Sequence, residues 1–366
     1  MNALELGLAA IDKCLTDELV RAKCRALLYG YNAMFRDAGY VTLEVEKYLE
    51  APLTNPDTNK NSRTFRMAGK VDAICELHGK QILFDHKTTS MDITDPNAPY
   101  WRQLVVEGQA SHYQLLLWMN GNKVDETIWD VVRKPTISPR KLTKAELAAF
   151  VADGIWCGRR FTEDDRYAMS QATEARETPA MYEARLAHDC TFERPEWYFQ
   201  RRPVARLDAE ILEYSREIWE HGQEILHARQ TKRNARNSGA CMLYGSPCRF
   251  LGICSGYDDP DSEKWQRKEF VHKELPVQDG DGKELLTNSR IRNFQTCRRK
   301  HFFDYELGIE RIDEEEREAL LFGQCWHTGL EKWFLSFKKE SENEYGQADS
   351  PANEAGQSTV AASDAG

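Results

Sequence analysis

Two acids and a lysine that lie close together are the residues best suited to carry out chemistry. Asp72 lies in GKVDAI, and Asp85 and Lys87 lie in ILFDHKT. Two carboxylates on neighbouring strands of a hairpin can share one divalent cation, and Lys87, two residues after Asp85, points to the same face of its strand. The trio suits hydrolysis of a phosphodiester, because the cation polarises the phosphoryl oxygen and activates water while the lysine orients that water or neutralises developing charge.

The surroundings of this trio favour a site over a solvated surface pair, which is the alternative interpretation of Asp-x-Lys on a strand. The apolar run at 82–84 is typical of a buried strand whose end opens at a site, and Gln109 and Tyr113 lie four residues apart on one helix face. With these residues the sequence resembles the PD-(D/E)XK nuclease superfamily and, within it, the RecB-like exonucleases. Their pattern is a glycine-preceded Asp, then (D/E)-x-K, then Gln-x-x-x-Tyr. The resemblance implies that Gln109 and Tyr113 belong to the catalytic site.

A histidine near the end of the chain extends the resemblance. The segment from Gly323 to Glu331 matches Gly-x-x-x-His-x-x-Leu-Glu, a helix that RecB-like nucleases carry, and its histidine is His327. The resemblance implies that His327 joins Asp72 and Asp85 as a metal ligand, whereas a lone helical histidine can also be purely structural. An imidazole ligand admits Mn²⁺ more readily than oxygen ligands alone, so we expect Mg²⁺ or Mn²⁺.

Four of the ten cysteines have the spacing of a ligand set. Three of them, Cys241, Cys248 and Cys254, lie in a loop that contains glycine and proline, and Cys297 in FQTCRRK is the candidate fourth. Here the sequence resembles iron–sulfur members of the superfamily, including AddB-type helicase–nuclease subunits and CRISPR adaptation exonucleases, which implies a [4Fe–4S] cluster. Arg298 replaces the proline of the usual motif, and the spacing of six and five replaces two and five. A structural Zn²⁺ bound by four thiolates is the alternative.

The remaining cysteines lack such spacing and are interpreted as core thiols: Cys14, Cys24, Cys75, Cys157, Cys190 and Cys325.

Composition and charge set the class of protein. The chain has 366 residues, 49 Lys and Arg against 59 Asp and Glu, and a net charge of −10. Part of that negative charge lies in the segment 338–366, which holds two lysines and six acidic residues, so a basic groove elsewhere is not excluded. The chain shows no apolar run long enough for a membrane span and no basic leader, and we expect a cytoplasmic protein that acts on DNA without a membrane.

The periodicity predicts an α/β protein with a PD-(D/E)XK restriction-endonuclease-like core, in which a central mixed sheet is flanked by helices beside a helical four-cysteine region. Strands are expected at 41–53, 64–77, 81–85 and 126–133, with helices at 101–119, 142–153, 207–229, 289–307 and 314–337 and two more in 1–37. We expect a nuclease core at 1–135, an insertion of uncertain role at 136–206, a helix and three-cysteine loop at 207–274, a linker at 275–288, helices carrying Cys297 and His327 at 289–337, and a disordered tail at 338–366.

The order of the motifs differs from that of the family. The segment 289–337 resembles the first helices of the family but comes last here, so the chain resembles a circular permutation, with 275–283 joining ends that a shared cluster would hold together. A linear cut through a circular genome would give the same order. The leading hypothesis is a metal-dependent DNA exonuclease in recombination, repair or phage DNA processing, with a recombination or helicase partner. The alternatives are a catalytically inactive nuclease-fold DNA-binding module and a zinc-bound scaffold.

Overall fold

The computed structural model describes residues 1–273, 275–276, 282–312 and 318–338. Its centre is a six-stranded sheet in the order β1-β2-β3-β4-β7, with β9 paired to β2. The strands are β1 (Val41–Thr54), β2 (Asn61–Leu77), β3 (Lys80–Thr89), β4 (Glu126–Arg133), β7 (Phe199–Val204) and β9 (Glu284–Leu286). The pairs β1–β2, β2–β3 and β4–β7 are antiparallel, whereas β3–β4 and β2–β9 are parallel. The prediction of a central mixed sheet flanked by helices is therefore confirmed.

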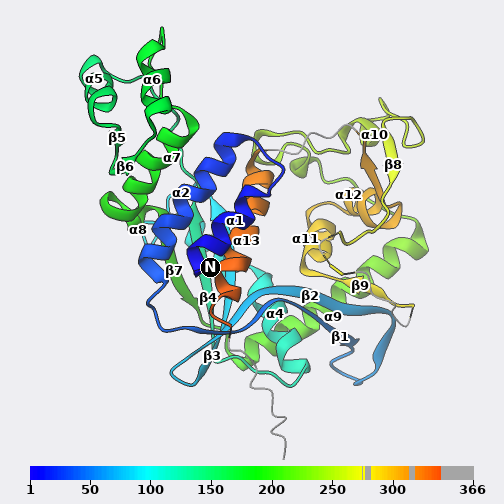
Figure 1. Cartoon of the computed structure of the whole chain (residues 1–366). Helices are drawn as coiled ribbons and strands as arrows, with labels where there is room; N and C mark the ends of the chain where they lie inside the picture. Colours follow the sequence, from blue (N-terminus) through cyan, green and yellow to red (C-terminus); the bar gives the residue numbers. More distant parts are fainter. Residues whose placement is uncertain (274, 277–281, 313–317, 339–366) are drawn as a thin grey trace, which may run out of the picture.

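Helices cover both faces of the sheet, and the alternation along β3 shows how. Ile82 and Phe84 pack into a core with α1 (Ala3–Asp12), α2 (Glu18–Phe35) and α13 (Glu318–Leu335), while Leu83 packs into a second core with α4 (Gly108–Met119) and α9 (Asp208–Thr231). Side chains alternate between faces along a strand, so Asp85 and Lys87 share the α4 side with Leu83, and His86 shares the α13 side. Figure 1 shows α1, α2 and α13 lying together although α13 comes from the end of the chain.

Two predicted helices are interrupted. The segment 101–119 forms α3 (Pro99–Val105) and α4, because Glu107 has extended backbone torsions before Gly108. A β-branched pair at 105–106 followed by glycine disfavours a continuous helix. The segment 289–307 forms α11 (Asn288–Thr296), α12 (Arg298–His301) and the π-turn η4 (Phe302–Glu306), with Cys297 extended between the first two. The break leaves the Cys297 thiol within 3.4 Å of the Asn237 main-chain N–H, which donates to it.

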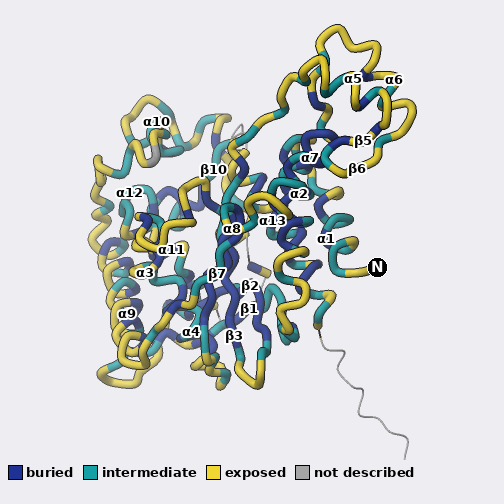
Figure 2. The backbone as a smooth tube through the Cα atoms, turned by 90° about the vertical axis from the view of Figure 1, so that its left-hand side faces the viewer, coloured by how far each residue is buried: buried dark blue, intermediate teal, exposed yellow. Residues whose placement is uncertain are grey.

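The region 136–206 contains a small unit with its own core. The unit comprises α5 (Lys144–Asp153), β5 (Ile155–Trp156), β6 (Arg159–Arg160) and α6 (Glu163–Gln171), and Phe150, Trp156 and Met169 form its centre. It projects from the body of the molecule in both Figure 1 and Figure 2. The following elements, α7 (Pro179–His188), η1 (Asp189–Glu193) and α8 (Pro195–Tyr198), return the chain to β7.

The three-cysteine loop belongs to a lobe on the opposite side of the molecule from this unit (Figure 2). The lobe contains η2 (Ser238–Ala240), η3 (Leu243–Gly245), α10 (Leu251–Ser255), β8 (Trp265–Arg267) and β10 (Ile309–Arg311), around Phe250, Trp265 and Phe303. Of the predicted linker, 277–281 lie outside the described residues, as do 339–366 of the predicted tail. No helix in the described part of the chain is long and apolar enough to cross a membrane.

Candidate active site

The two predicted catalytic acids lie where β2 and β3 separate. The pairing of these strands runs from Leu77 and Lys80 to Ala73 and Phe84 and stops there, one residue before Asp72 and Asp85. Strand β3 continues along β4, whereas β2 continues along β1. The Asp72 carboxylate occupies the resulting gap, and its Oδ2 accepts a hydrogen bond of 2.7 Å from the main-chain N–H of His86.

On one face of the sheet, Asp85 and Lys87 lie beside Gln109 and Tyr113 of helix α4. The ammonium of Lys87 lies 2.5 Å from Asp85 Oδ2 and donates to Gln109 Oε1 at 2.5 Å. Gln109 Nε2 in turn donates to the Tyr113 hydroxyl at 2.9 Å. The structure therefore joins four of the five predicted catalytic residues in one polar chain.

A glycine on β2 permits this close approach of α4. A Cβ at Gly69 would lie 3.0 Å from both the Tyr113 ring and Leu116, which is tighter than ordinary packing allows. On the other side, the Lys87 ammonium lies 5.0 Å from the centre of the Trp129 ring, a cation–π contact. Lys87 is thus held from two directions.

The burial of Asp85 outweighs its ion pair with Lys87. Its side chain is only 2% exposed, and burial raises its pKa to about 7; Lys87 opposes this rise and the neighbouring Asp72 adds to it. The contact of Asp85 Oδ2 with the Lys87 ammonium is an ion pair without hydrogen-bond geometry, and Oδ2 accepts no hydrogen bond from another described residue. A buried carboxylate oxygen with a single cationic neighbour is a fitting ligand for a divalent cation.

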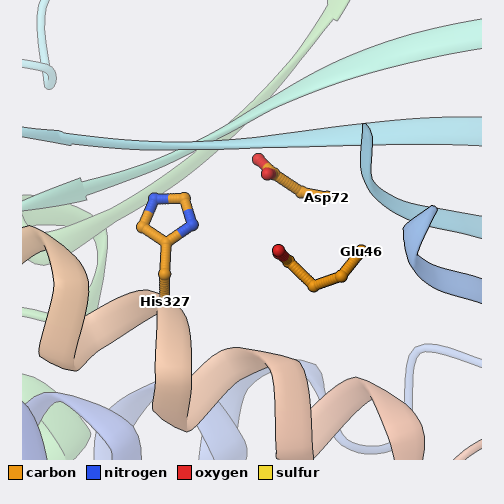
Figure 3. A group of neighbouring side chains, drawn as sticks. All are labelled: Glu46, Asp72 and His327. Carbon is orange, nitrogen blue, oxygen red and sulfur yellow. The ribbon is translucent and has the colours of Figure 1, made fainter. Parts of the chain in front are cut away.

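His327 reaches the site from the opposite face of the sheet, on α13. Its imidazole, the Asp72 carboxylate and the Glu46 carboxylate each offer a ligand atom, and the three atoms lie within 4.8 Å of one another (Figure 3). Burial lowers the pKa of His327, which favours the neutral imidazole that binds metal ions. Asp85 does not belong to this group of three, although it lies near enough to Asp72 for that carboxylate to raise its pKa.

Glu46 is the residue that the sequence analysis missed. The antiparallel register, with Val45 opposite Ala73 and Lys47 opposite Val71, brings it beside Asp72. Glu46 has φ of +51°, a left-handed conformation that is rare for a residue with a side chain and that often marks functional sites. Burial raises its pKa, and the nearby Asp72 adds to this rise although Lys70 forms an ion pair with Glu46. The sequence signal is weak, because finding Glu46 requires the register of two strands.

The four predicted cluster cysteines line one pocket. Arg236, Arg299 and Lys300 line the same pocket as Cys241, Cys248, Cys254 and Cys297. Among the described residues, no three of these thiols lie within 4.8 Å of one another. In a tetrahedral zinc site with Zn–S bonds of about 2.3 Å, the sulfurs would be separated by about 3.8 Å. The structure therefore brings the four cysteines together, with a spacing wider than a closed zinc site.

Comparison with known proteins gives one match. A family model described as the PD-(D/E)XK nuclease superfamily matches residues 286–363. The matched segment includes Cys297 and His327 but not Asp72, Asp85 or Lys87. No curated protein and no solved structure matches the chain.

Proposed function

We propose that this protein is a metal-dependent nuclease of the PD-(D/E)XK type that hydrolyses phosphodiester bonds in DNA. One observation carries the proposal: Asp72 and Asp85 lie where two strands separate, with Lys87 on one face and His327 on the other. These groups come from segments more than 200 residues apart in the sequence. Their convergence reproduces an acid, acid, lysine and histidine set, and the superfamily match over 286–363 supports it independently.

The residues present fit a divalent cation. Asp72, Glu46 and His327 would hold it, with Asp85 as a further oxygen ligand whose Oδ2 lacks a hydrogen bond among the described residues. When bound, such a cation polarises the phosphoryl oxygen and makes water a better nucleophile. Mg²⁺ suits the carboxylates, and the imidazole also admits Mn²⁺.

The chain's own residues orient the substrate and the water. Lys87 places an ammonium next to Asp85, where it can orient the attacking water or offset the charge that develops on the phosphate. Gln109 fixes that ammonium by accepting its hydrogen bond, and Tyr113 accepts one from Gln109. Gln109 and Tyr113 are therefore assigned to holding Lys87 in place.

The finer assignment is a RecB-like, AddB-type exonuclease with a permuted motif order that acts in recombination, repair or phage DNA processing, with a recombination or helicase partner. Support comes from the position of α13, the last described helix. It packs against α1 and brings His327 to the catalytic hairpin, as expected if the family's first helices come last in this chain. The four cysteines are assigned to a [4Fe–4S] cluster, and their lining of one shared pocket supports a common ligand.

A cleavage assay on end-labelled single-stranded and duplex DNA tests the function. With Mg²⁺ or Mn²⁺, we expect cleavage by the wild type and a loss of at least about 100-fold in rate for Lys87→Ala, the usual cost of removing one preorganised charge. Lys80→Ala, an exposed lysine at the start of the same strand, is the matched control and should cleave normally. Equal rates for the two variants would exclude this site, and DNA binding without any cleavage would identify an inactive nuclease-fold binding module.

A further inference from the structure

A cationic surface lies beside the four-cysteine pocket, and its residues come from other segments than those of the catalytic hairpin. The chain contains no acidic residue from Gln230 to Gly256, although its net charge is −10. The surface is defined by five residues: Lys232, Arg233, Arg236, Arg299 and Lys300. Within the described residues, none of the five forms an ion pair with a carboxylate, whereas the neighbouring Arg229 and Arg290 are both paired with Glu284 and Glu306. Their charges are therefore available to a partner.

A cavity of about 320 Å³ opens beside this surface, between α9 and the α11–α12 segment. Ile225, Ala228, Phe294 and Phe302 form its apolar walls. Its polar lining comes from Lys232, Asn234, His301 and the ion pair between Arg229 and Glu306. Arg299 Nε donates to the Asn234 carbonyl at 2.8 Å, so the segment that borders the cavity is fixed to the cationic surface. The cavity and the cationic surface are therefore adjacent, and Lys232 belongs to both.

Lys232 occupies an unusual backbone position for a side chain of its size. It ends α9 with φ of +54°, in the left-handed region where glycine or asparagine is usual. A residue with a Cβ is strained there, and such strain is often found at functional positions. A lysine therefore lines the cavity at a position where a glycine would fold more easily.

We propose that this surface binds a single-stranded segment of DNA, with phosphates on the cations and one unstacked base in the cavity. The inference rests on the proposed function in that it takes DNA as the substrate. Unpaired lysines and arginines match a row of phosphates, and an apolar cavity with aromatic walls and a polar rim matches a base. A base in a duplex is stacked and paired and cannot enter, so the cavity selects for single strands.

Fluorescence anisotropy with a labelled oligothymidylate and a blunt duplex, in buffer without divalent cations, tests the surface apart from cleavage. The double variant Lys232→Ala/Arg233→Ala removes two cations that do not line the four-cysteine pocket. Each phosphate contact to a single strand contributes about 0.7 to the slope of log K against log salt, so we expect the slope to fall by about 1.4 and the affinity by about 25-fold at 0.1 M salt. The matched control Lys13→Ala/Lys80→Ala removes two exposed lysines elsewhere and should bind like the wild type.

Two further variants separate base binding and folding from charge. Ala228→Leu fills the cavity and should weaken binding of the single strand by about 5-fold or more, the usual cost of losing one base contact, with no change in salt slope. Lys232→Gly relieves the left-handed backbone, so it should unfold at the same or a higher temperature while binding about 5-fold more weakly.

If the two double variants bind the single strand with equal affinity and equal salt slope, the cationic surface does not bind DNA. If Ala228→Leu binds the single strand as tightly as the wild type, the cavity does not hold a base. A wild type that binds in this way but cleaves no DNA would refute the proposed nuclease and leave the surface standing. If the wild type cleaves DNA and Lys232→Ala/Arg233→Ala binds DNA normally, the proposed nuclease stands and the proposed surface is refuted.

Discussion

Replacing Asp85 by asparagine should make the metal-free protein more stable at neutral pH while it abolishes cleavage. The pKa of Asp85 rises from its ordinary value of 3.8 to about 7 chiefly because the carboxyl is buried. One pKa unit corresponds to about 1.4 kcal/mol, so the ionised carboxylate destabilises the folded protein by about 4 kcal/mol above pH 7. Asparagine has almost the same shape and no charge, and it removes this cost.

The sign of the pH dependence is fixed by linkage. Between pH 4 and 7 the folded protein retains a proton on Asp85 that the unfolded chain has lost, so the unfolding free energy of the wild type falls as the pH rises through this window. The unfolding free energy of Asp85→Asn does not fall in this way, because asparagine does not titrate. The difference in unfolding free energy between the two proteins should therefore be constant below about pH 4, grow by up to about 1.4 kcal/mol per pH unit between 4 and 7, and level off above.

Urea unfolding at a series of pH values, in buffer without divalent cations, measures this difference. Asp57→Asn, at an exposed acid in the β1–β2 turn, is the matched control and should follow the wild type throughout. Adding Mn²⁺ should stabilise the wild type more than Asp85→Asn, because the variant keeps Asp72, Glu46 and His327 but lacks the further carboxylate ligand. A difference that stays flat from pH 4 to 8 would show that Asp85 ionises as in water, and the closed, desolvated site would be refuted.

Three other outcomes are expected. His327→Ala and Glu46→Gln should each weaken Mn²⁺ binding, followed by calorimetry, on the order of 10-fold or more while leaving the fold intact; unchanged affinity would remove that residue from the ligand set. Cys297→Ser should lose iron, sulfide, visible absorption and thermal stability, whereas Cys157→Ser should retain all four, and a colourless wild type holding one zinc would replace the cluster by zinc. Asp130→Asn should lower the unfolding free energy at pH 7 by about 3–5 kcal/mol, because it leaves the largely buried Arg201 guanidinium without its carboxylate, and a loss below 1 kcal/mol would contradict this.

The fold could be predicted to a large extent from local patterns. The apolar run at 82–84 and the turn at 78–80 define the hairpin, and the strand 126–133 is recognisable by its apolar residues before Pro135. The break at Glu107 has a local signal in the β-branched pair at 105–106 and in Gly108, but the helical spacing on either side masked it. The break at Cys297 could not be predicted in this way, because helical spacing continues on both sides of it.

The candidate site shows the same division. Asp85 and Lys87 are two residues apart on one strand, so their proximity follows from strand geometry alone. Glu46 approaches Asp72 only through the register of β1 against β2, and His327 only through the packing of α13 on the sheet. Arg201, in the aromatic and basic segment 198–202, is largely buried in an ion pair with Asp130. Composition alone cannot separate an exposed cation from one that neutralises a buried acid.

This buried ion pair explains how the separated strands keep their geometry. Asp130 on β4 binds Arg201 of β7, the Tyr31 hydroxyl of α2 and the His86 ring of β3, so three strands and a helix share one carboxylate. Although burial alone would raise its pKa, Arg201 and His86 together hold the pKa of Asp130 well below its usual range, so the carboxylate stays charged and keeps all three partners. His86 is also the residue whose main-chain N–H binds the Asp72 carboxylate. Because His86 contacts both Asp72 and Asp130, a neutral Asp130 should loosen the position of Asp72 as well as the fold.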